Sequence, residues 1–85
     1  MSDIAKTLEG RNHTHGDFTH QAMIAESLQE DMRCRDGWGN LTDVQKQALF
    51  MIQHKVARII AGNPNERDHW HDIQGYAKLA EDRCK

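Results

Sequence analysis

Residues 43–61 run without a glycine or a proline, and their apolar side chains recur at the spacing of an amphipathic helix. The main stripe consists of Val44, Ala48, Met51 or Ile52, Val56 and Ile59. Leu49, Phe50 and Ile60 widen this stripe beyond a single face. A helix that is apolar over more than half of its circumference is central in its fold or is covered by a partner chain. The segment therefore requires other helices, or a second chain, on several of its sides.

Both ends of this central helix are marked in the sequence. Thr42 is followed three residues later by Gln45, which is the capping-box pattern of a helix N-terminus. Gly62 and Pro64 follow the last apolar residues, as is typical where a helix ends. The segment before the helix, residues 36–41, holds two glycines and is predicted to be a connector.

The N-terminal part of the chain is predicted to hold one short helix and a loop. Residues 3–9 can form the helix, with Asp3 as the N-cap and Gly10 as the stop. Residues 11–17 are polar, contain a glycine and are predicted to form the loop. Asp17 then stands directly before the next helical segment, where it can act as an N-cap.

Two more long helices complete the predicted fold. Segment 18–35 carries an apolar stripe made of Phe18, Ala22, Ala25, Leu28 or Gln29, and Met32. Segment 66–83 carries a stripe made of Trp70, Ile73, Ala77, Ala80 and Cys84. Short connections favour antiparallel neighbours, and no strand-like alternation is present. Residues 1–85 are therefore predicted to form one all-α domain, a small antiparallel bundle of three long helices plus a short N-terminal helix.

Length and charge narrow the class of protein. A lone chain of 85 residues buries only about 60–65% of its unfolded surface, so a homodimer or homotetramer is expected. Eleven basic and 13 acidic residues give a formal charge of −2, which argues against general nucleic-acid binding.

The sequence also indicates a compartment. No apolar run reaches the roughly 18 residues of a membrane span, and the N-terminus lacks the pattern of a secretory signal. We therefore expect a cytoplasmic protein in which Cys34 and Cys84 are reduced thiols.

Asp68 and Asp72 form the first candidate site. They lie one helical turn apart on the last helix, so their carboxylates are neighbours that need a cation, a basic partner or water. Lys55 and Arg58 on the central helix can supply the basic partner. The aspartates can alternatively hold a cation, with Lys55 or Arg58 on the phosphate of a ligand.

Three motifs carry a family resemblance: Gly10-Arg11-x-x-x-His15-Gly16-Asp17, Lys55-x-x-Arg58 and Asp68-x-Trp70-x-Asp72-Ile73-x-Gly75-Tyr76-Ala77. In order and spacing they resemble the R-x-x-x-Y-G-D, K-x-x-R and D-x-W-x-D-I-x-G-Y-A motifs of phage-associated MazG-like domains. The resemblance covers residues 10–80, with His15 where the family has tyrosine. It implies an all-α fold similar to the NTP pyrophosphatases, in which carboxylates from two helices hold Mg²⁺ on a nucleoside triphosphate.

For this chain the resemblance implies Asp68 and Asp72 as Mg²⁺ ligands. It also implies a Glu-x-x-Glu pair on the central helix, but residues 43–61 contain only one acidic residue, Asp43. Glu26 and Glu30, one turn apart on the first long helix, are the candidate replacements.

The loop before the first long helix offers further candidates. Arg11 and His15 can close over the site and contact a phosphate, while Asp17 supports the loop as a helix cap. The alternative is plain loop chemistry with a solvated Arg11. Tyr76 follows Asp72 by one turn and can hydrogen-bond to it.

The histidines do not predict a zinc site. His69 and His71 point in directions about 200° apart on a helix, so they cannot bind one ion together. His13 and His15 supply only two ligands, and structural zinc needs four. His20, His54 and His71 are expected in solvent or at an interface, and Trp38 is expected to pack or to stack on a base.

Three functions follow from these observations. The first is an Mg²⁺-dependent NTP pyrophosphohydrolase, which the missing glutamate pair opposes. The second is a binding protein that sequesters a nucleotide or a nucleotide signal without chemistry. The third is a helical interaction module that uses the broad apolar surface of residues 44–60.

Overall fold

All regular structure in the computed structural model is helical. The structure describes residues 2–85, except for the side chains of Ser2 and Asn12. Its elements are α1 (Ser2–His15), α2 (Phe18–Arg33), the short 3₁₀ helix η1 (Asp36–Asn40), α3 (Asp43–Ala61) and α4 (Arg67–Glu81). No strand forms among residues 2–85, so the all-α prediction is confirmed.

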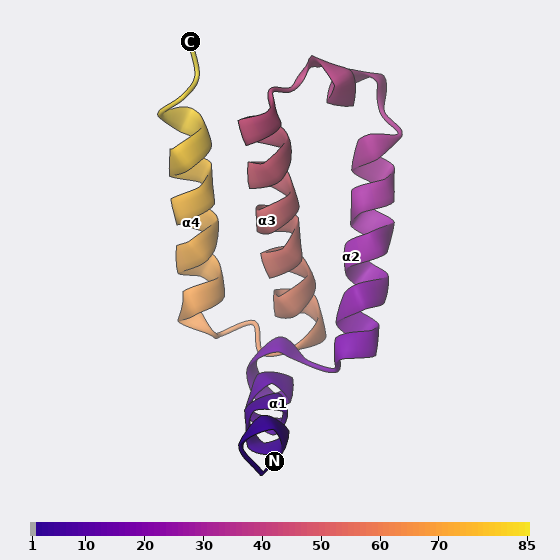
Figure 1. Cartoon of the computed structure of the whole chain (residues 1–85), viewed down its shortest axis with the longest axis vertical. Coiled ribbons are helices and arrows are strands. Elements are labelled where there is room, and N and C mark those ends of the chain that lie inside the picture. Colours follow the sequence, from indigo (N-terminus) through magenta and orange to yellow (C-terminus); the bar gives the residue numbers. More distant parts are fainter. Residues whose placement is uncertain (1) are drawn as a thin grey trace.

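The arrangement places α3 at the centre. Figure 1 shows α3 between α2 and α4, with each neighbour antiparallel to it and α1 at the end where α3 finishes. α3 packs against α1, α2 and α4, which confirms that the broadly apolar segment is central. The molecule is elongated, with extents of 47 × 26 × 25 Å.

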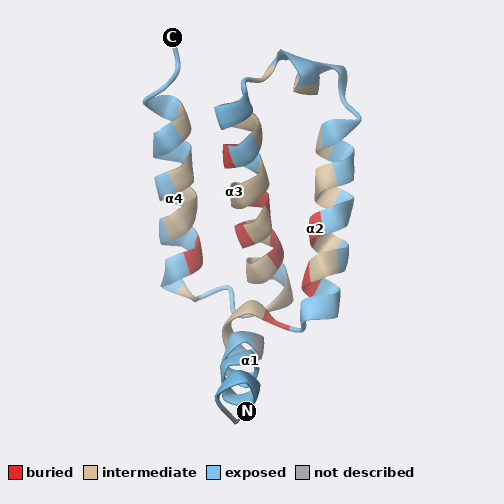
Figure 2. Cartoon of the chain, viewed as in Figure 1, coloured by how far each residue is buried: buried red, intermediate tan, exposed pale blue. Residues whose placement is uncertain are grey.

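The core of the described chain is small. Its buried apolar residues are Ala25, Ala48 and Ala57. They lie on α3 and on the side of α2 that faces it, as Figure 2 shows. Larger apolar side chains remain partly in solvent, including Leu49 at 39% and Ile60 at 60% exposure. Alanine lets the helix backbones approach closely, but it buries little apolar area.

Local capping explains where the helices begin. The Thr42 side chain accepts from the backbone of Gln45, and the Gln45 side chain accepts from the backbone of Thr42, which confirms the predicted capping box. Asp17 Oδ2 accepts from the backbone N–H of His20 at 3.1 Å, so the predicted cap of α2 is confirmed as well. Each cap satisfies an N–H group that has no partner within the helix.

The N-terminal prediction was wrong in its bounds. α1 does not stop at Gly10 but continues to His15, so most of the predicted loop over residues 11–17 is helix. The helix ends at Gly16, whose φ of 79° is a conformation that favours glycine. Glycine inside a helix costs only about 1 kcal/mol relative to alanine, so Gly10 is tolerated.

Two aromatic residues predicted on core stripes lie in solvent. Phe18 is 70% exposed, and Gln21 and Ala25 are the buried residues of α2. Trp70 is 51% exposed and donates from Nε1 to the carbonyl of Pro64 at 2.8 Å. The true inner face of α4 therefore begins one residue earlier than predicted, at the buried His69.

Trp38 packs against side chains of its own chain, which is one of the two alternatives predicted for it. Its ring lies 5.0 Å from the ring of Phe50, measured between centroids, and Lys46 Nζ lies 5.9 Å from its centroid. The contact ties η1 to the start of α3. None of the helices among residues 2–85 is both long enough and apolar enough to span a membrane.

Candidate functional site

The junction of α1 and α3 is a close backbone contact between two glycines. A Cβ atom added at Gly16 would collide with the carbonyl of Ala61, and one added at Gly62 would lie 2.5 Å from Gly16 N. The backbone N–H of Asn63 donates to the carbonyl of Thr14 at 3.2 Å. These contacts hold the last turn of α1 against the C-terminal end of α3.

His69 connects α4 to the same point. It is 2% exposed, and its Nε2 lies 3.1 Å from the carbonyl oxygen of Thr14. A carbonyl can only accept, so Nε2 of His69 carries the proton in this contact. The ring also packs edge-on against the ring of His15, with centroids 4.7 Å apart. α1, α3 and α4 thus meet around Thr14.

His15 is held by Thr14 and surrounded by cations. Its Nδ1 lies 2.8 Å from Oγ1 of Thr14. Burial lowers the pKa of His15, and electrostatic interactions with Arg58, His69, Arg11 and Lys55 lower it further. The neutral ring is therefore favoured, because protonation would add a charge to an already basic cluster.

Lys55 is a buried cation with one carboxylate partner. The residue is 8% exposed, and its Nζ lies 2.9 Å from Oδ2 of Asp72 on α4. The hydrogen bond and charge of Lys55 hold the pKa of Asp72 below its usual range. The predicted pairing between the basic and acidic pairs is confirmed for these two residues.

Arg58 lies one turn beyond Lys55 and is not paired in this way. Its Nε is buried and has no hydrogen-bond partner among the described residues. Burial and the nearby charge of Arg11 lower the pKa of Arg58, while Asp72 and Tyr76 oppose that shift. A buried guanidinium N–H without an acceptor is destabilising, so this position favours an incoming anion.

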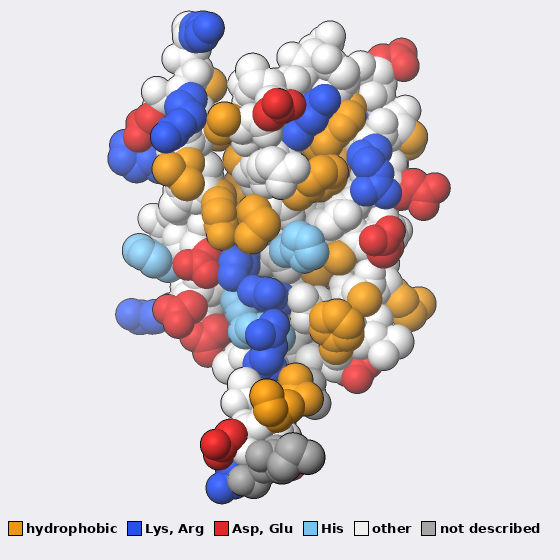
Figure 3. Space-filling view, in the orientation of Figure 1, with side chains coloured by type: hydrophobic (Ala, Val, Ile, Leu, Met, Phe, Trp, Pro, Cys, Tyr) orange, Lys and Arg blue, Asp and Glu red, His pale blue; other side chains and the backbone are white. Residues whose placement is uncertain are grey.

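These side chains line one pocket of about 290 Å³, which we call the His–Arg pocket. Its lining residues are Thr14, His15, Lys55, Arg58, Glu66, Asp68, His69 and Asp72. Figure 3 shows a strip of basic side chains along the middle of this face, with histidine beside it and acidic side chains toward α4. The pocket therefore has a basic wall from α3 and an acidic wall from the start of α4.

The structure brings most of the predicted site together. His15, Lys55, Arg58, Asp68 and Asp72 all line the His–Arg pocket, although they come from three helices. The charges of the two helices predicted this grouping for Lys55, Arg58, Asp68 and Asp72. His15 was predicted to reach the site from a loop, but it reaches the site from the last turn of α1.

Other predicted residues lie elsewhere. Arg11 and Glu26 line a different pocket on the α2 side of Arg58, and Glu30 is exposed on α2. Glu26 and Glu30 are therefore not brought to the aspartates, because α2 and α4 flank opposite sides of α3 (Figure 1). Tyr76 lines a neighbouring pocket with Asp72, but no hydrogen bond joins the two among the described side chains.

The carboxylates of the pocket do not fit a resident metal cage. Asp72 is engaged by Lys55, and residues 2–85, as far as their side chains are described, contain no group of three His, Cys, Asp or Glu residues that could hold an ion. Mg²⁺ bound through one or two carboxylates keeps several waters and shares the phosphates of its ligand. Asp68 and Glu66 fit only this second role, beside a phosphate on the basic wall.

Sequence reasoning missed Thr14, Glu66 and His69 as parts of the site. His69 had been considered only as a zinc ligand, together with His71. A signal was present: His69 stands between Asp68 and Trp70, one turn before Ile73, so a small rotation of the predicted stripe places it inward. Thr14 contacts His69 and Asn63 through its backbone carbonyl, which leaves no signal in the sequence, and His15 through its side chain.

Comparison with known proteins gives a family and no activity. No curated protein and no solved structure shows a significant match to the chain. One family profile covers almost all of it, from residue 1 to residue 84. The chain belongs to the family described as Domain of unknown function (DUF6378).

Proposed function

We propose that this protein binds a nucleotide, with the phosphates of the ligand in the His–Arg pocket. The observation that carries the proposal is Arg58, whose side chain lines the pocket and whose buried Nε has no acceptor in the part of the chain that the structure describes. A phosphate offers the acceptor oxygens that a guanidinium binds through two parallel hydrogen bonds.

The surroundings of Arg58 support an anionic ligand. Burial and the nearby Arg11 lower the pKa of Arg58, and burial and the same cluster of cations lower the pKa of His15. Asp72 offsets part of this charge, but its carboxylate is bound by Lys55. An anion in the pocket relieves the repulsion among the remaining cations, so binding is favoured by electrostatics as well as by hydrogen bonds.

The resemblance to phage-associated MazG-like domains supports a nucleotide as the source of the phosphate. The motif residues Arg58, Asp68 and Asp72 meet at one pocket. Asp68 adds a place for Mg²⁺ carried by the nucleotide. We propose binding without hydrolysis. The carboxylates at this pocket all come from the chain segment around the start of α4 and not from two helices, as in the NTP pyrophosphatases, and Asp72 is already paired with Lys55.

The test is a comparison of ligands with and without Mg²⁺. Isothermal titration with the four ribonucleoside triphosphates, the four deoxyribonucleoside triphosphates and inorganic tripolyphosphate should give saturable binding for at least one. Release of pyrophosphate should stay at the background of a sample without protein. Pyrophosphate release above background would make the protein a pyrophosphohydrolase, and no binding of any phosphate compound would overturn the proposal.

We also propose that the protein acts as a homodimer or homotetramer. A folded monomer of 9.8 kDa is expected to expose roughly 5,200 Å². This chain exposes 6393 Å², and its radius of gyration of 14.6 Å exceeds the roughly 12 Å expected for its length. The excess of about 1,200 Å² is similar to the area of about 800 Å² that each partner buries in a standard interface.

The surface for a second copy is the open side of α3 and α4. An apolar groove of about 410 Å³ lies there, lined by Val44, Ala48, Met51, Tyr76 and Leu79 among others. Leu79 is 49% exposed and Val44 is 41% exposed. A second copy that covers this groove supplies the apolar burial that three alanines cannot provide.

A further inference from the structure

A second polar pocket lies on the other side of Arg58, between α2 and α3. Its volume is about 340 Å³, within the range of small-molecule sites. Arg58 lines both this pocket and the His–Arg pocket, so the two share one side chain as a wall. We call the second one the glutamine pocket because Gln21 and Gln29 line it.

Gln21 is the first sign of a ligand in the glutamine pocket. The residue is 5% exposed and lines the pocket, and no hydrogen bond to its side-chain amide is present among the described residues. An amide side chain has two N–H donors and a carbonyl acceptor. A ligand in the pocket that carries complementary groups can therefore pair with this amide.

A hydrogen-bonded row continues from Gln29 into α3. Gln29 Nε2 lies 2.8 Å from Oε1 of Gln53 and 3.2 Å from Nε2 of His54. The amide nitrogen can only donate, so Nε2 of His54 accepts and its Nδ1 remains a donor. Gln53 is 4% exposed, and its Nε2 has no partner among the described residues. The row fixes His54 and Gln29 in place at the pocket wall.

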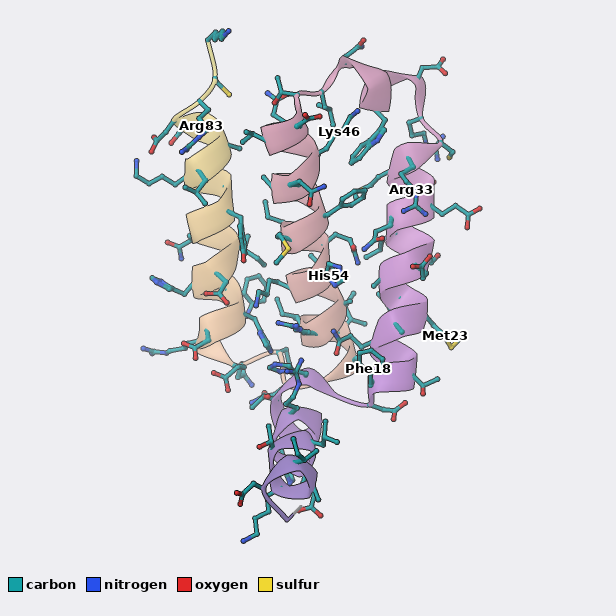
Figure 4. The ribbon with its side chains drawn as sticks, viewed as in Figure 1. Phe18, Met23, Arg33, Lys46, His54 and Arg83 are labelled. Carbon is teal, nitrogen blue, oxygen red and sulfur yellow. The ribbon has the colours of Figure 1, made fainter. Side chains whose placement is uncertain are left out.

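Aromatic and apolar side chains form another part of the pocket wall, which suits a planar group. Phe18 is 70% exposed and lines the pocket, and Ala22 and Ala25 add apolar surface on the same helix. Figure 4 shows Phe18 and His54 in the space between α2 and α3, from opposite helices. Glu26 also lines the pocket, beside Arg11 and Arg58, and its carboxylate can accept from an amino group.

From these contacts we infer that the glutamine pocket binds the base of the nucleotide whose phosphates occupy the His–Arg pocket. The ligand class is a planar heterocycle with hydrogen-bond donors and acceptors on its edge. Gln21, Gln29 and His54 meet that edge, and Phe18 contacts the face. Arg58, at the wall shared by the two pockets, lies where base and phosphates join. The inference rests on the proposed function for its phosphate half only.

The first test compares nucleotides with inorganic tripolyphosphate, which has no base. The wild-type protein should bind at least one nucleoside triphosphate tenfold or more tightly than tripolyphosphate. Gln21→Met keeps the size of the side chain and removes the amide, so it should lose most of this tenfold advantage. Gln74→Met, a change of the same kind at an exposed position on α4, is the control and should keep it.

A second test separates this inference from the proposed function. Free nucleosides, which carry no phosphate, should shift the side-chain amide signals of Gln21 and Gln29 and the ring signals of His54 in NMR spectra at millimolar concentration. Such shifts without any binding of tripolyphosphate would support the glutamine pocket and overturn the phosphate site. Equal affinity for nucleotides and tripolyphosphate, with no shift on adding nucleosides, would overturn the inference.

Discussion

Lys55 of α3 and Asp72 of α4 form an ion pair, with 2.9 Å between Nζ and Oδ2, at the centre of the basic wall. The pair joins α4 to α3, and it engages Asp72, one of the two aspartates of the predicted site. It also leaves Arg58, one turn further along α3, as the cation whose buried Nε has no acceptor among the described residues. The chemistry of the pocket follows from this division between a paired lysine and an unsatisfied arginine.

Breaking the ion pair from the acidic side should destabilise the fold. In Asp72→Asn the ammonium of Lys55, whose side chain is only 10% exposed, loses its charged partner beside Arg58. We expect a lower Tm than in the wild type. Lys55→Met with Asp72→Asn should recover much of that loss, because no buried charge remains. Thermal denaturation of both single variants and the double variant measures the coupling, and an unchanged Tm in Asp72→Asn would contradict it.

Two glycines, one inside α1 and one directly after it, should respond in opposite ways to alanine. Gly16→Ala should destabilise the protein by about 1–3 kcal/mol, because the position has φ of 79° and its Cβ would meet the carbonyl of Ala61. Gly10→Ala meets nothing within 4 Å and lies inside α1, so it should stabilise by up to about 1 kcal/mol. Chemical denaturation checks both. Equal effects at the two positions would contradict the close contact of Gly16 with Ala61.

Protonation of His15 should make the fold less stable in mildly acidic solution. Its pKa is lowered in the folded state, so the unfolded chain binds the proton more readily. The stability that depends on neutral His15 is present above the ordinary histidine pKa of about 6.5 and declines as the pH falls below it. His15→Asn should flatten the change in Tm between pH 7.5 and 5.5, whereas His13→Asn, at an exposed position on the same helix, should not. The same slope in both variants would remove His15 from the cause.

The open side of α3 and α4 should control the oligomeric state. The wild type is expected to be a dimer or tetramer by light scattering, because its exposed area exceeds that of a compact monomer. Leu79→Asp places a charge in the apolar groove and should give monomers. Met23→Asp, at a residue of α2 that is 67% exposed, should leave the oligomer intact. A monomeric wild type, or loss of the oligomer only in Met23→Asp, would contradict this surface.

Local signals in the sequence were sufficient to predict much of the fold. Asp17, Thr42 and Gln45 place the starts of two helices through hydrogen bonds made within three residues, so the sequence contains all the partners. The end of α1 was different. The sequence predicted Gly10 as the stop, whereas the positive φ of Gly16 and its contact with Ala61 and Gly62 place the stop there, and that contact depends on the tertiary fold.

The sequence predicted the contacts of the site that depend on charge. It did not predict the contacts that depend on how α4 is rotated about its own axis. Lys55 and Asp72 pair because a buried cation needs a carboxylate, which could be argued from the two helices alone. The side of α4 that faces inward could not be predicted in this way. Trp70 and His69 are neighbours in the sequence. His69 is the one that faces inward, because its ring reaches the carbonyl of Thr14 on another helix.

The most direct test of the account is the affinity of Arg58 variants for inorganic tripolyphosphate, measured by isothermal titration. Arg58→Gln should weaken binding by about 10- to 100-fold, because charge-assisted hydrogen bonds contribute roughly 1.5–3 kcal/mol. Arg35→Gln removes the same charge at an exposed position just after α2, away from the His–Arg pocket, and should change the affinity less than twofold. If Arg58→Gln binds as tightly as the wild type, or no more weakly than Arg35→Gln, Arg58 is not the phosphate-binding residue and the His–Arg pocket is not the site.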